Sequence, residues 1–270
     1  MSELNIDLHP AQLQIFNSKK RFKIVAAGRR FGKSYLSAWL LLINAIQSES
    51  KDVFYVGPTF QQSKDIMWAM LKDLGKDLIA QAHENTAVLT LINGRKIYLK
   101  GSDRPDTLRG VGLAFCVLDE YASMKPQVWE QIIRPTLSDV QGGALFIGTP
   151  AGKNHFYDLY IDAFEDDDWD AFQFTSTDNP FIPDSEIKAA SKTMSSMSFR
   201  QEFEASFETN SGGIFKEEWF EKSEEPEEGS YVIAVDPAGF ESIEKERNLK
   251  RSRLDETAIA IVKIDRDKWW

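Results

Sequence analysis

FKIVAAGRRFGKS, residues 22–34, is the stretch that decides the fold of this chain. It opens with the apolar run 22–27, which predicts a short buried strand, and it continues into a turn that contains two glycines. Residues 27–34 match the pattern of a phosphate-binding P-loop (Walker A), except that Ala27 stands where the pattern has its first glycine. The run 34–47 is apolar on most sides and predicts a helix buried between a sheet and other helices. A strand, a glycine turn and a helix in this order predict a phosphate site.

The residue types in the loop suit ATP. Backbone amides of a tight turn form a nest for phosphate, and the start of the following helix adds partial positive charge. Gly32 lets the backbone approach the phosphates, Lys33 would reach the β- and γ-phosphates, and the Ser34 hydroxyl would bind Mg²⁺. The competing interpretation is a plain glycine turn with a surface lysine, which the flanking strand and helix disfavour. The expected nucleotide-binding residues of the loop are Gly28, Arg29, Arg30, Gly32, Lys33 and Ser34.

Two adjacent carboxylates follow the apolar run 113–118, at the position of a Walker B strand. We expect Asp119 to hold Mg²⁺ through water and Glu120 to act as the general base toward the attacking water. Neighbouring residues of a strand point in opposite directions, so one metal-side role and one water-side role are geometrically sensible. The alternative is a strand end capped by acids at a solvated loop.

Other side chains are candidates for roles at the same site. Thr149 follows the apolar run 144–148 and would contact the γ-phosphate or the water, although a plain turn is the alternative. Arg29, Arg30 and Arg109 are each candidates for stabilising the charge of the transferred phosphoryl group, in cis or from a neighbouring subunit, against the alternative of a surface salt bridge. Gln12 can donate and accept at once, which suits the adenine edge, but it is equally expected as an exposed glutamine at a helix start.

The pattern along the chain predicts an α/β fold. Strands alternate with helices in the first half, which is typical of a mostly parallel sheet covered on both faces, and Asn93-Gly94 between runs 87–92 and 96–100 adds an antiparallel hairpin. Strand 171–175 and helices 184–194 and 198–208 predict a small lid beside the core. The expected divisions are an ATPase core at 1–150, a lid at 151–208, a linker at 209–230 and a further domain that starts at 231–270 with strands 231–236 and 256–264.

The composition bears on DNA binding, membrane insertion and the cellular compartment. The chain has 270 residues with 32 Lys and Arg against 42 Asp and Glu, a net charge of −10, which argues against a broad sequence-independent DNA-binding surface but not against local basic patches. No apolar run reaches the roughly 18 residues of a membrane span, and the N-terminus lacks the layout of a signal peptide. Cys116 is the only cysteine, which fits a reducing cytoplasm.

Several motifs together carry a resemblance to a known family. In chain order they are Gln12, the P-loop with Arg29, Tyr55-Val56-Gly57-Pro58-Thr59, Leu108-Arg109-Gly110, Leu118-Asp119-Glu120, Gly148-Thr149-Pro150, Phe199-Arg200-Gln201-Glu202-Phe203-Glu204 with Gly212-Gly213-Ile214-Phe215, and Val235-Asp236-Pro237-Ala238. The set resembles the large terminase subunit of tailed bacteriophages over nearly the whole chain. Single motifs are shared with helicases, but this order is specific.

The resemblance implies a P-loop ATPase of the additional-strand, catalytic-glutamate type with a lid, acting in the host cytoplasm as a viral motor. It implies subunits that are monomeric in solution and that assemble into a ring on the portal protein. The ring would work with the small terminase subunit and move double-stranded DNA into a procapsid. Arg29 would be the loop arginine and Arg109 the arginine that acts in trans. Asp236 would be the first metal-binding acid of a ribonuclease-H-like nuclease, and Asp255 would at best support the metal ligands without touching the metal. With the other acids beyond Trp270, we expect no nuclease activity from this chain.

Two other functions stay open at this point. A helicase-like remodelling ATPase would need a second motor domain, for which the chain has no room. A nucleotide-gated module for ring assembly would bind ATP but hydrolyse it weakly alone. For the surface that touches DNA, the basic segment 245–253 is one candidate, although a solvated loop is the better interpretation.

Overall fold

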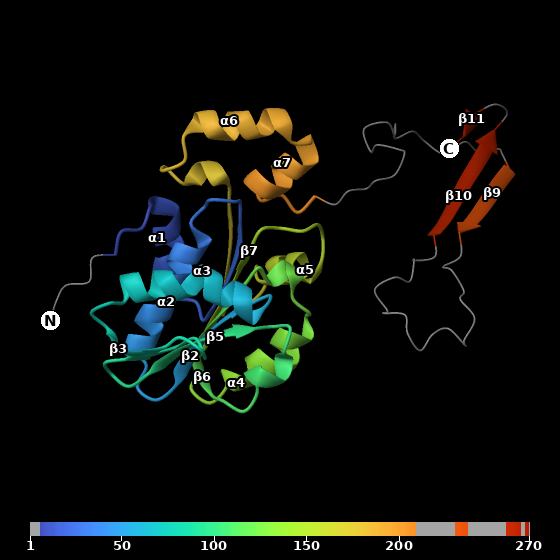
Figure 1. Cartoon of the computed structure of the whole chain (residues 1–270). Coiled ribbons are helices and arrows are strands. Elements are labelled where there is room, and N and C mark those ends of the chain that lie inside the picture. Colours follow the sequence, from blue (N-terminus) through green and yellow to red (C-terminus); the bar gives the residue numbers. More distant parts are fainter. Residues whose placement is uncertain (1–5, 209–229, 237–257, 266–267, 270) are drawn as a thin grey trace. The chain divides into compact units, whose positions relative to one another are not determined.

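The computed structural model describes residues 6–208, 230–236, 258–265 and 268–269 (Figure 1). The chain divides into two compact units, Met1–Asn210 and Ser211–Trp270. The first unit carries every side chain that the sequence assigned to the nucleotide site. Among the described residues, no helix combines the length and the apolar character that crossing a bilayer requires.

An eight-stranded mixed sheet forms the centre of the first unit, in the order β3-β4-β5-β2-β6-β7-β1-β8. The strands from β5 to β8 in this order run parallel, and β3, β4 and β5 are joined antiparallel. This confirms the mostly parallel sheet with an antiparallel hairpin around Asn93-Gly94. The strands are β1 (Phe22–Ala27), β2 (Asp52–Gly57), β3 (Ile79–His83), β4 (Val88–Leu91), β5 (Lys96–Gly101), β6 (Leu113–Asp119), β7 (Gly143–Gly148) and β8 (Trp169–Phe174).

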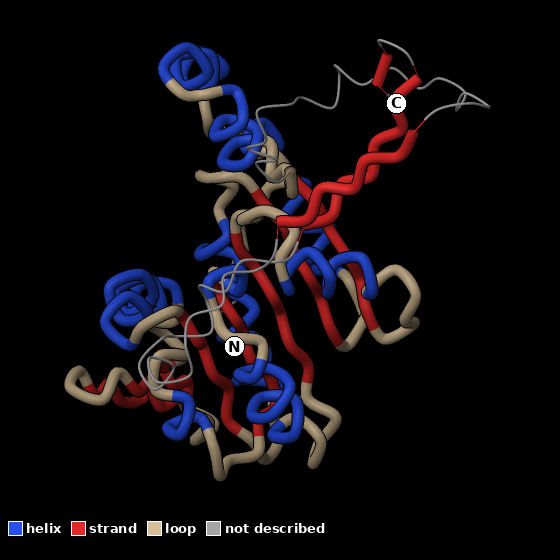
Figure 2. Tube along the Cα trace, turned by 90° about the vertical axis from the view of Figure 1, so that its right-hand side faces the viewer, coloured by secondary structure: helices blue, strands red, loops and turns tan. Residues whose placement is uncertain are grey.

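Helices cover both faces of the sheet, as Figure 2 shows. Alternate strand residues point to opposite faces, so β1 sends Val25 and Ala27 into one apolar layer and Ile24 and Ala26 into the other. The first layer contains α1 (Pro10–Asn17), α2 (Lys33–Gln47) and α3 (Phe60–Leu74). The second contains α5 (His155–Asp162) and a π-helical turn, η3 (Val128–Ile133), which leads into α4 (Arg134–Thr136). Short 3₁₀ turns complete the set at η1 (Pro105–Leu108), η2 (Tyr121–Ser123) and η4 (Ser176–Asp178).

The strand expected near 171–175 is present, but it belongs to the main sheet and not to the lid. We placed it in the lid, but β8 pairs in parallel with β1 along the edge of the main sheet, with Phe22 opposite Trp169. Its side chains explain this position, because Phe172 and Phe174 pack against one apolar layer while Trp169 and Ala171 pack against the other. Strand β3 was not expected at all; most of its residues are exposed, so it has no apolar alternation to reveal it.

Two helices follow the sheet, α6 (Asp184–Thr193) and α7 (Ser196–Phe203), and they lie together beyond the ends of the strands in Figure 1. Helix α7 begins and ends earlier than the predicted 198–208. Ser195 caps it by accepting a hydrogen bond from the Ser198 amide, and Ala205 beyond its end has a left-handed φ of 53°. The helix thus brings Gln201 and Glu202 to its last turn, near the loop that follows β1.

The second unit contains a three-stranded antiparallel sheet in the order β11-β10-β9. Its strands are β9 (Ser230–Asp236), β10 (Ala258–Asp265) and β11 (Lys268–Trp269), close to the two strands expected there. Asp236 ends β9 with Ala258 as its register partner. Residues 209–229 of the expected linker, Asp255 and the basic segment 245–253 lie outside the described residues.

Candidate functional site

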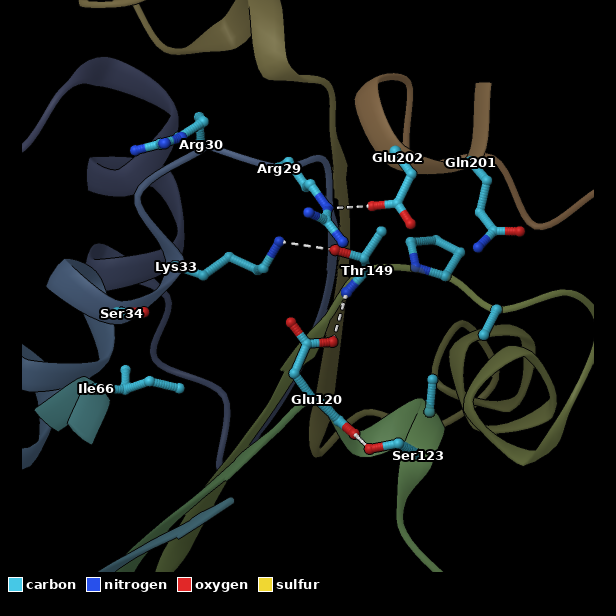
Figure 3. A pocket seen from close by; sticks show the side chains of 13 residues that line it. Arg29, Arg30, Lys33, Ser34, Ile66, Glu120, Ser123, Thr149, Gln201 and Glu202 are labelled. Carbon is cyan, nitrogen blue, oxygen red and sulfur yellow. Dashed lines mark hydrogen bonds and ion pairs between the residues drawn. The ribbon is translucent and has the colours of Figure 1, made fainter. Parts of the chain in front are cut away.

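A cavity of about 740 Å³ opens where the loop after β1 meets the ends of β6 and β7 (Figure 3). These three strands are parallel, so their carboxyl ends lie at one edge of the sheet, the usual ligand-binding edge of an open α/β sheet. The lining residues come from this loop and the start of α2, from the segments that follow β6 and β7, which include η2, and from α3 and α7. They are Arg29, Arg30, Lys33, Ser34, Ile66, Glu120, Ala122, Ser123, Thr149, Pro150, Ala151, Gln201 and Glu202.

The two glycines of the loop sit where no other residue fits. Gly32 has a left-handed φ of 96°, and a Cβ there would lie 2.5 Å from Nε2 of Gln12. A Cβ on Gly28 would lie 2.6 Å from the carbonyl oxygen of Phe203 and 2.7 Å from Oγ of Ser176. Ala27, the departure from the P-loop pattern, is still part of β1 and pairs with β8, so strand geometry suits its methyl group.

Lys33 is the first residue of α2 and reaches across the floor of the loop. Its ammonium group donates to the carbonyl oxygens of Ala27 at 2.8 Å and Gly28 at 3.0 Å, and to Oγ1 of Thr149 at 3.0 Å. Burial lowers the pKa of Lys33, while the negative charge of Glu120 acts in the opposite direction. The lysine therefore links the loop to the end of β7, with Thr149 as the shared contact.

The two carboxylates diverge at the end of β6. Asp119 is buried, and its Oδ1 accepts a hydrogen bond of 3.0 Å from the Glu120 amide. Glu120 has a left-handed φ of 53°, which is strained for a residue with a Cβ and turns its side chain into the cavity below Thr149. The Thr149 amide lies 3.5 Å from Oε2 of Glu120. Burial raises the pKa of both carboxyl groups, and the charge of Asp119 raises that of Glu120 further.

The oxygen ligands at this edge suit Mg²⁺. A hydroxyl group and a carboxylate, Ser34 and Asp119, are hard oxygen donors of the kind that Mg²⁺ prefers, with the remaining positions left to water and phosphate. Among the described residues, no cluster of three or more His, Cys, Asp or Glu side chains could hold a metal by itself.

The arginines divide between the cavity and the surface. Arg29 lines the cavity, and its Nε lies 2.5 Å from Oε2 of Glu202 on α7. The side chain of Arg30 also lines the cavity but points away from Lys33 and Glu120 in Figure 3. Arg109 is not among the lining residues: its side chain is 53% exposed and its Nε lies 3.6 Å from Asp106. The structure thus brings Arg29 and Arg30 to the site of their own chain and leaves Arg109 outside it.

Gln12 is not the exposed glutamine of the alternative interpretation. It is 3% exposed, and its amide group contacts the phosphate loop by donating to the carbonyl oxygen of Gly32 at 3.0 Å. Its Oε1 accepts from the His9 amide at 3.2 Å, which completes a capping box at the start of α1. Both polar ends of Gln12 are therefore bound within the chain, and its contact with adenine remains a prediction.

Comparison with known proteins identifies the family. The sequence model described as terminase large subunit, T4likevirus-type, N-terminal, matches residues 24–222. The chain belongs to the terminase large subunit family. The terminase large subunit of Escherichia phage T5 is 31% identical over 215 residues, which are 76% of this chain and 49% of that protein. That of Thermus virus P23-45 is 25% identical over 258 residues, 77% of this chain and 50% of that protein.

Solved terminase structures share the fold. The large terminase ATPase domain of Thermus phage P74-26 has a TM-score of 0.66 at 25% identity, covering 74% of this chain and 94% of that domain. The large terminase of another thermophilic bacteriophage has a TM-score of 0.67 at 15% identity, covering 97% of this chain and 66% of that one. This terminase chain spans about half the length of the curated relatives it matches.

Sequence reasoning missed three groups that this terminase chain places around the loop. Glu202 pairs with Arg29 through its carboxylate and accepts a hydrogen bond of 2.6 Å from the Arg29 amide through its backbone carbonyl. Ser176 and Asn179 donate to the carbonyl oxygens of Arg29 and Arg30, each at 2.6 Å. Glu202 belongs to the motif 199–204, which contributed to the family resemblance but to which the sequence assigned no role at the site. The polar residues after β8 gave no signal, because their contacts are far apart in sequence.

Proposed function

We propose that this chain binds ATP with Mg²⁺ in the cavity at the end of β1, β6 and β7 and hydrolyses it. The observation that carries the proposal is the convergence of Lys33, Thr149 and Glu120 on one cavity beside a glycine loop whose shape excludes side chains. The ATPase domain from Thermus phage P74-26 supports it, since it matches at 25% identity over 94% of its length. These two observations favour an ATP-hydrolysing motor over a nucleotide-gated assembly module that hydrolyses ATP only weakly.

Each residue has a role in this proposal. Lys33 exchanges its contacts with loop carbonyl groups for contacts with the β- and γ-phosphate oxygens, and Glu120 takes a proton from the attacking water. Ser34 and Asp119 are the residues to hold the Mg²⁺, which when bound would neutralise charge on the same phosphates. Thr149 lies between Lys33 and Glu120 and would couple phosphate contact to the position of the base.

The arginines take two roles. Arg29 leaves Glu202 to contact the γ-phosphate, so α6 and α7 act as a lid whose last turn responds to the nucleotide. Arg109 is exposed and outside its own cavity, which supports a role at the site of a neighbouring subunit. Gly28, Gly32 and Arg30 would contact phosphates through their backbone, and Gln12 holds the loop in place.

We further propose that ATP hydrolysis drives packaging of double-stranded DNA, because the chain belongs to the terminase large subunit family. The portal protein, the small terminase subunit and a homo-oligomeric ring are the partners that this function needs, in the host cytoplasm. Asp236 as a nuclease metal ligand also remains a proposal, since its side chain lies outside what the structure describes.

Steady-state phosphate release against protein concentration tests the proposal. We expect turnover that depends on Mg²⁺ and that disappears in Lys33→Ala, because this change removes the cation that clamps the phosphates. A faster than linear rise with concentration would support a site completed by a neighbour. Unchanged turnover in Lys33→Ala would place the nucleotide site elsewhere and overturn the proposal.

A further inference from the structure

A buried tyrosine contacts the metal-side carboxylate of the candidate site. Tyr55 lies in β2 with 0% of its surface exposed, in the apolar layer that also contains α2. Its hydroxyl group donates a hydrogen bond to Oδ2 of Asp119. The roles given above do not use this contact, although Tyr55 opens one of the motifs that distinguish the sequence. A substitution at either residue would therefore remove a hydrogen bond from the other.

Strand register explains why these two residues meet. Strands β2 and β6 are parallel neighbours, and Tyr55 lies opposite Val117. Asp119 is two residues further along β6, so it points to the same face as Val117 and is the diagonal neighbour of Tyr55. A diagonal neighbour is within reach of an aromatic side chain. The sheet itself, rather than a loop, thus sets the position of the hydroxyl group.

The Asp119 carboxylate is held from both sides. The Tyr55 hydroxyl donates to Oδ2, and the Glu120 amide donates to Oδ1 at 3.0 Å. Both donors are fixed, one by the strand and the other by the left-handed turn at Glu120. Each carboxylate oxygen can still accept a second hydrogen bond, while Asp119 itself is 4% exposed and is not among the residues that line the cavity. The carboxylate is therefore oriented before any ion binds, which lowers the entropy cost of binding.

We propose that Tyr55 is a positioning residue for magnesium–nucleotide binding, because its hydroxyl group holds the Asp119 carboxylate in one orientation. This inference rests on the proposed function, since it assigns Asp119 to the metal. Tyr55 is not among the residues that line the cavity. It acts only through Asp119.

The substitution Tyr55→Phe tests this, because it keeps the ring in the core and removes only the hydroxyl group. The measurement is binding of a fluorescent ATP analogue, titrated with Mg²⁺ and repeated in EDTA. We expect the half-saturating Mg²⁺ concentration to rise about 10- to 100-fold, as for other residues that support a metal ligand, with affinity in EDTA unchanged. Tyr98→Phe is the matched control: Tyr98 lies on the neighbouring strand β5 and packs against Phe54. It should leave the Mg²⁺ titration as in the wild type.

A second pair of variants separates positioning from simple packing. In an Asp119→Asn background the added Tyr55→Phe change should not shift the Mg²⁺ titration further, because the residue through which it acts is already altered. Equal Mg²⁺ half-saturation in wild type and Tyr55→Phe would overturn the inference. A loss of affinity that is the same with Mg²⁺ and in EDTA would overturn it too, as it shows a structural role. If wild-type binding itself ignores Mg²⁺, the proposed function fails and the inference with it.

Discussion

Both the backbone conformation and the side-chain position of Glu120 support its role as the general base. Its φ of 53° is costly for any residue with a Cβ, and the turn aims its carboxylate at the cavity beside Thr149. Glutamine has the same backbone preference and the same size, and its amide oxygen can still accept from the Thr149 amide. It cannot take a proton. Glu120→Gln thus separates the base from the fold.

We expect Glu120→Gln to lower ATP hydrolysis by about 10²- to 10⁴-fold, the usual contribution of a general base, with little change in nucleotide affinity. Phosphate release and equilibrium binding on one preparation check this. Thermal unfolding should occur at or above the wild-type temperature, because the strain at residue 120 is the same and the negative charge that burial and Asp119 disfavour is removed. Hydrolysis at the wild-type rate would exclude Glu120 as the base.

Arg109, unlike Glu120, lies outside the cavity of its own chain and has a half-exposed side chain, so we expect it to act at the site of a neighbouring subunit. We expect Arg109→Ala to bind ATP normally but to hydrolyse it poorly, with partial recovery on mixing with Glu120→Gln subunits. Recovery requires one chain to supply the arginine and another to supply the base. Arg104→Ala, a change at an exposed arginine in the same segment, is the control. Weaker ATP binding by Arg109→Ala would instead place Arg109 in its own site.

At the scale of single elements, the sequence predicted what is local and missed what is distant. The loop 27–34 and the helix after it follow from neighbouring residues, and so does the hairpin at Asn93-Gly94. The partner of β8 does not, because Trp169 pairs with Phe22 on a neighbouring strand that lies far earlier in the sequence. An apolar strand has the same pattern whichever sheet it joins.

The same limit applies inside the site. Glu120 and Lys33 were predictable, since each sits in a short motif with a known chemical role. The contact of Tyr55 with Asp119 and that of Arg29 with Glu202 join residues on separate elements. Only the register of β2 on β6 and the end of α7 bring them together, and no spacing in the sequence shows either.

The turn between β4 and β5 provides a test of an element by itself. Gly94 has a φ of 81°, and a Cβ there would meet nothing within 4 Å, so strain and not crowding sets the cost of a side chain. We expect Gly94→Ala to reduce the free energy of unfolding by about 1 kcal/mol, measured in urea. Gly94→Asn should cost less, because asparagine tolerates this conformation better. Equal losses for both would show that left-handed strain is not the cause.

In the first unit as a whole, the same sheet forms the centre of the core and carries the candidate site. The strands that carry the site at their ends also separate the two apolar layers. Cys116 lies in β6 between β2 and β7, three residues before Asp119, with 0% of its surface exposed. Burial raises the pKa of its thiol, so the reactive thiolate is disfavoured as well as inaccessible. A thiol reagent can therefore reach Cys116 only when the sheet opens.

The rate of Cys116 modification should thus report opening of the site's own strand, and Cys116 is the only cysteine in the chain. Because ATP binds the folded state, nucleotide at about 100 times its dissociation constant should slow modification about 100-fold, equivalent to about 2.7 kcal/mol. Lys33→Ala is the control, since a chain that cannot clamp phosphates should show no such protection. Rapid modification in native buffer, unaffected by nucleotide, would mean that β6 opens independently of the site. The sheet would then not couple ligand binding to the stability of the core.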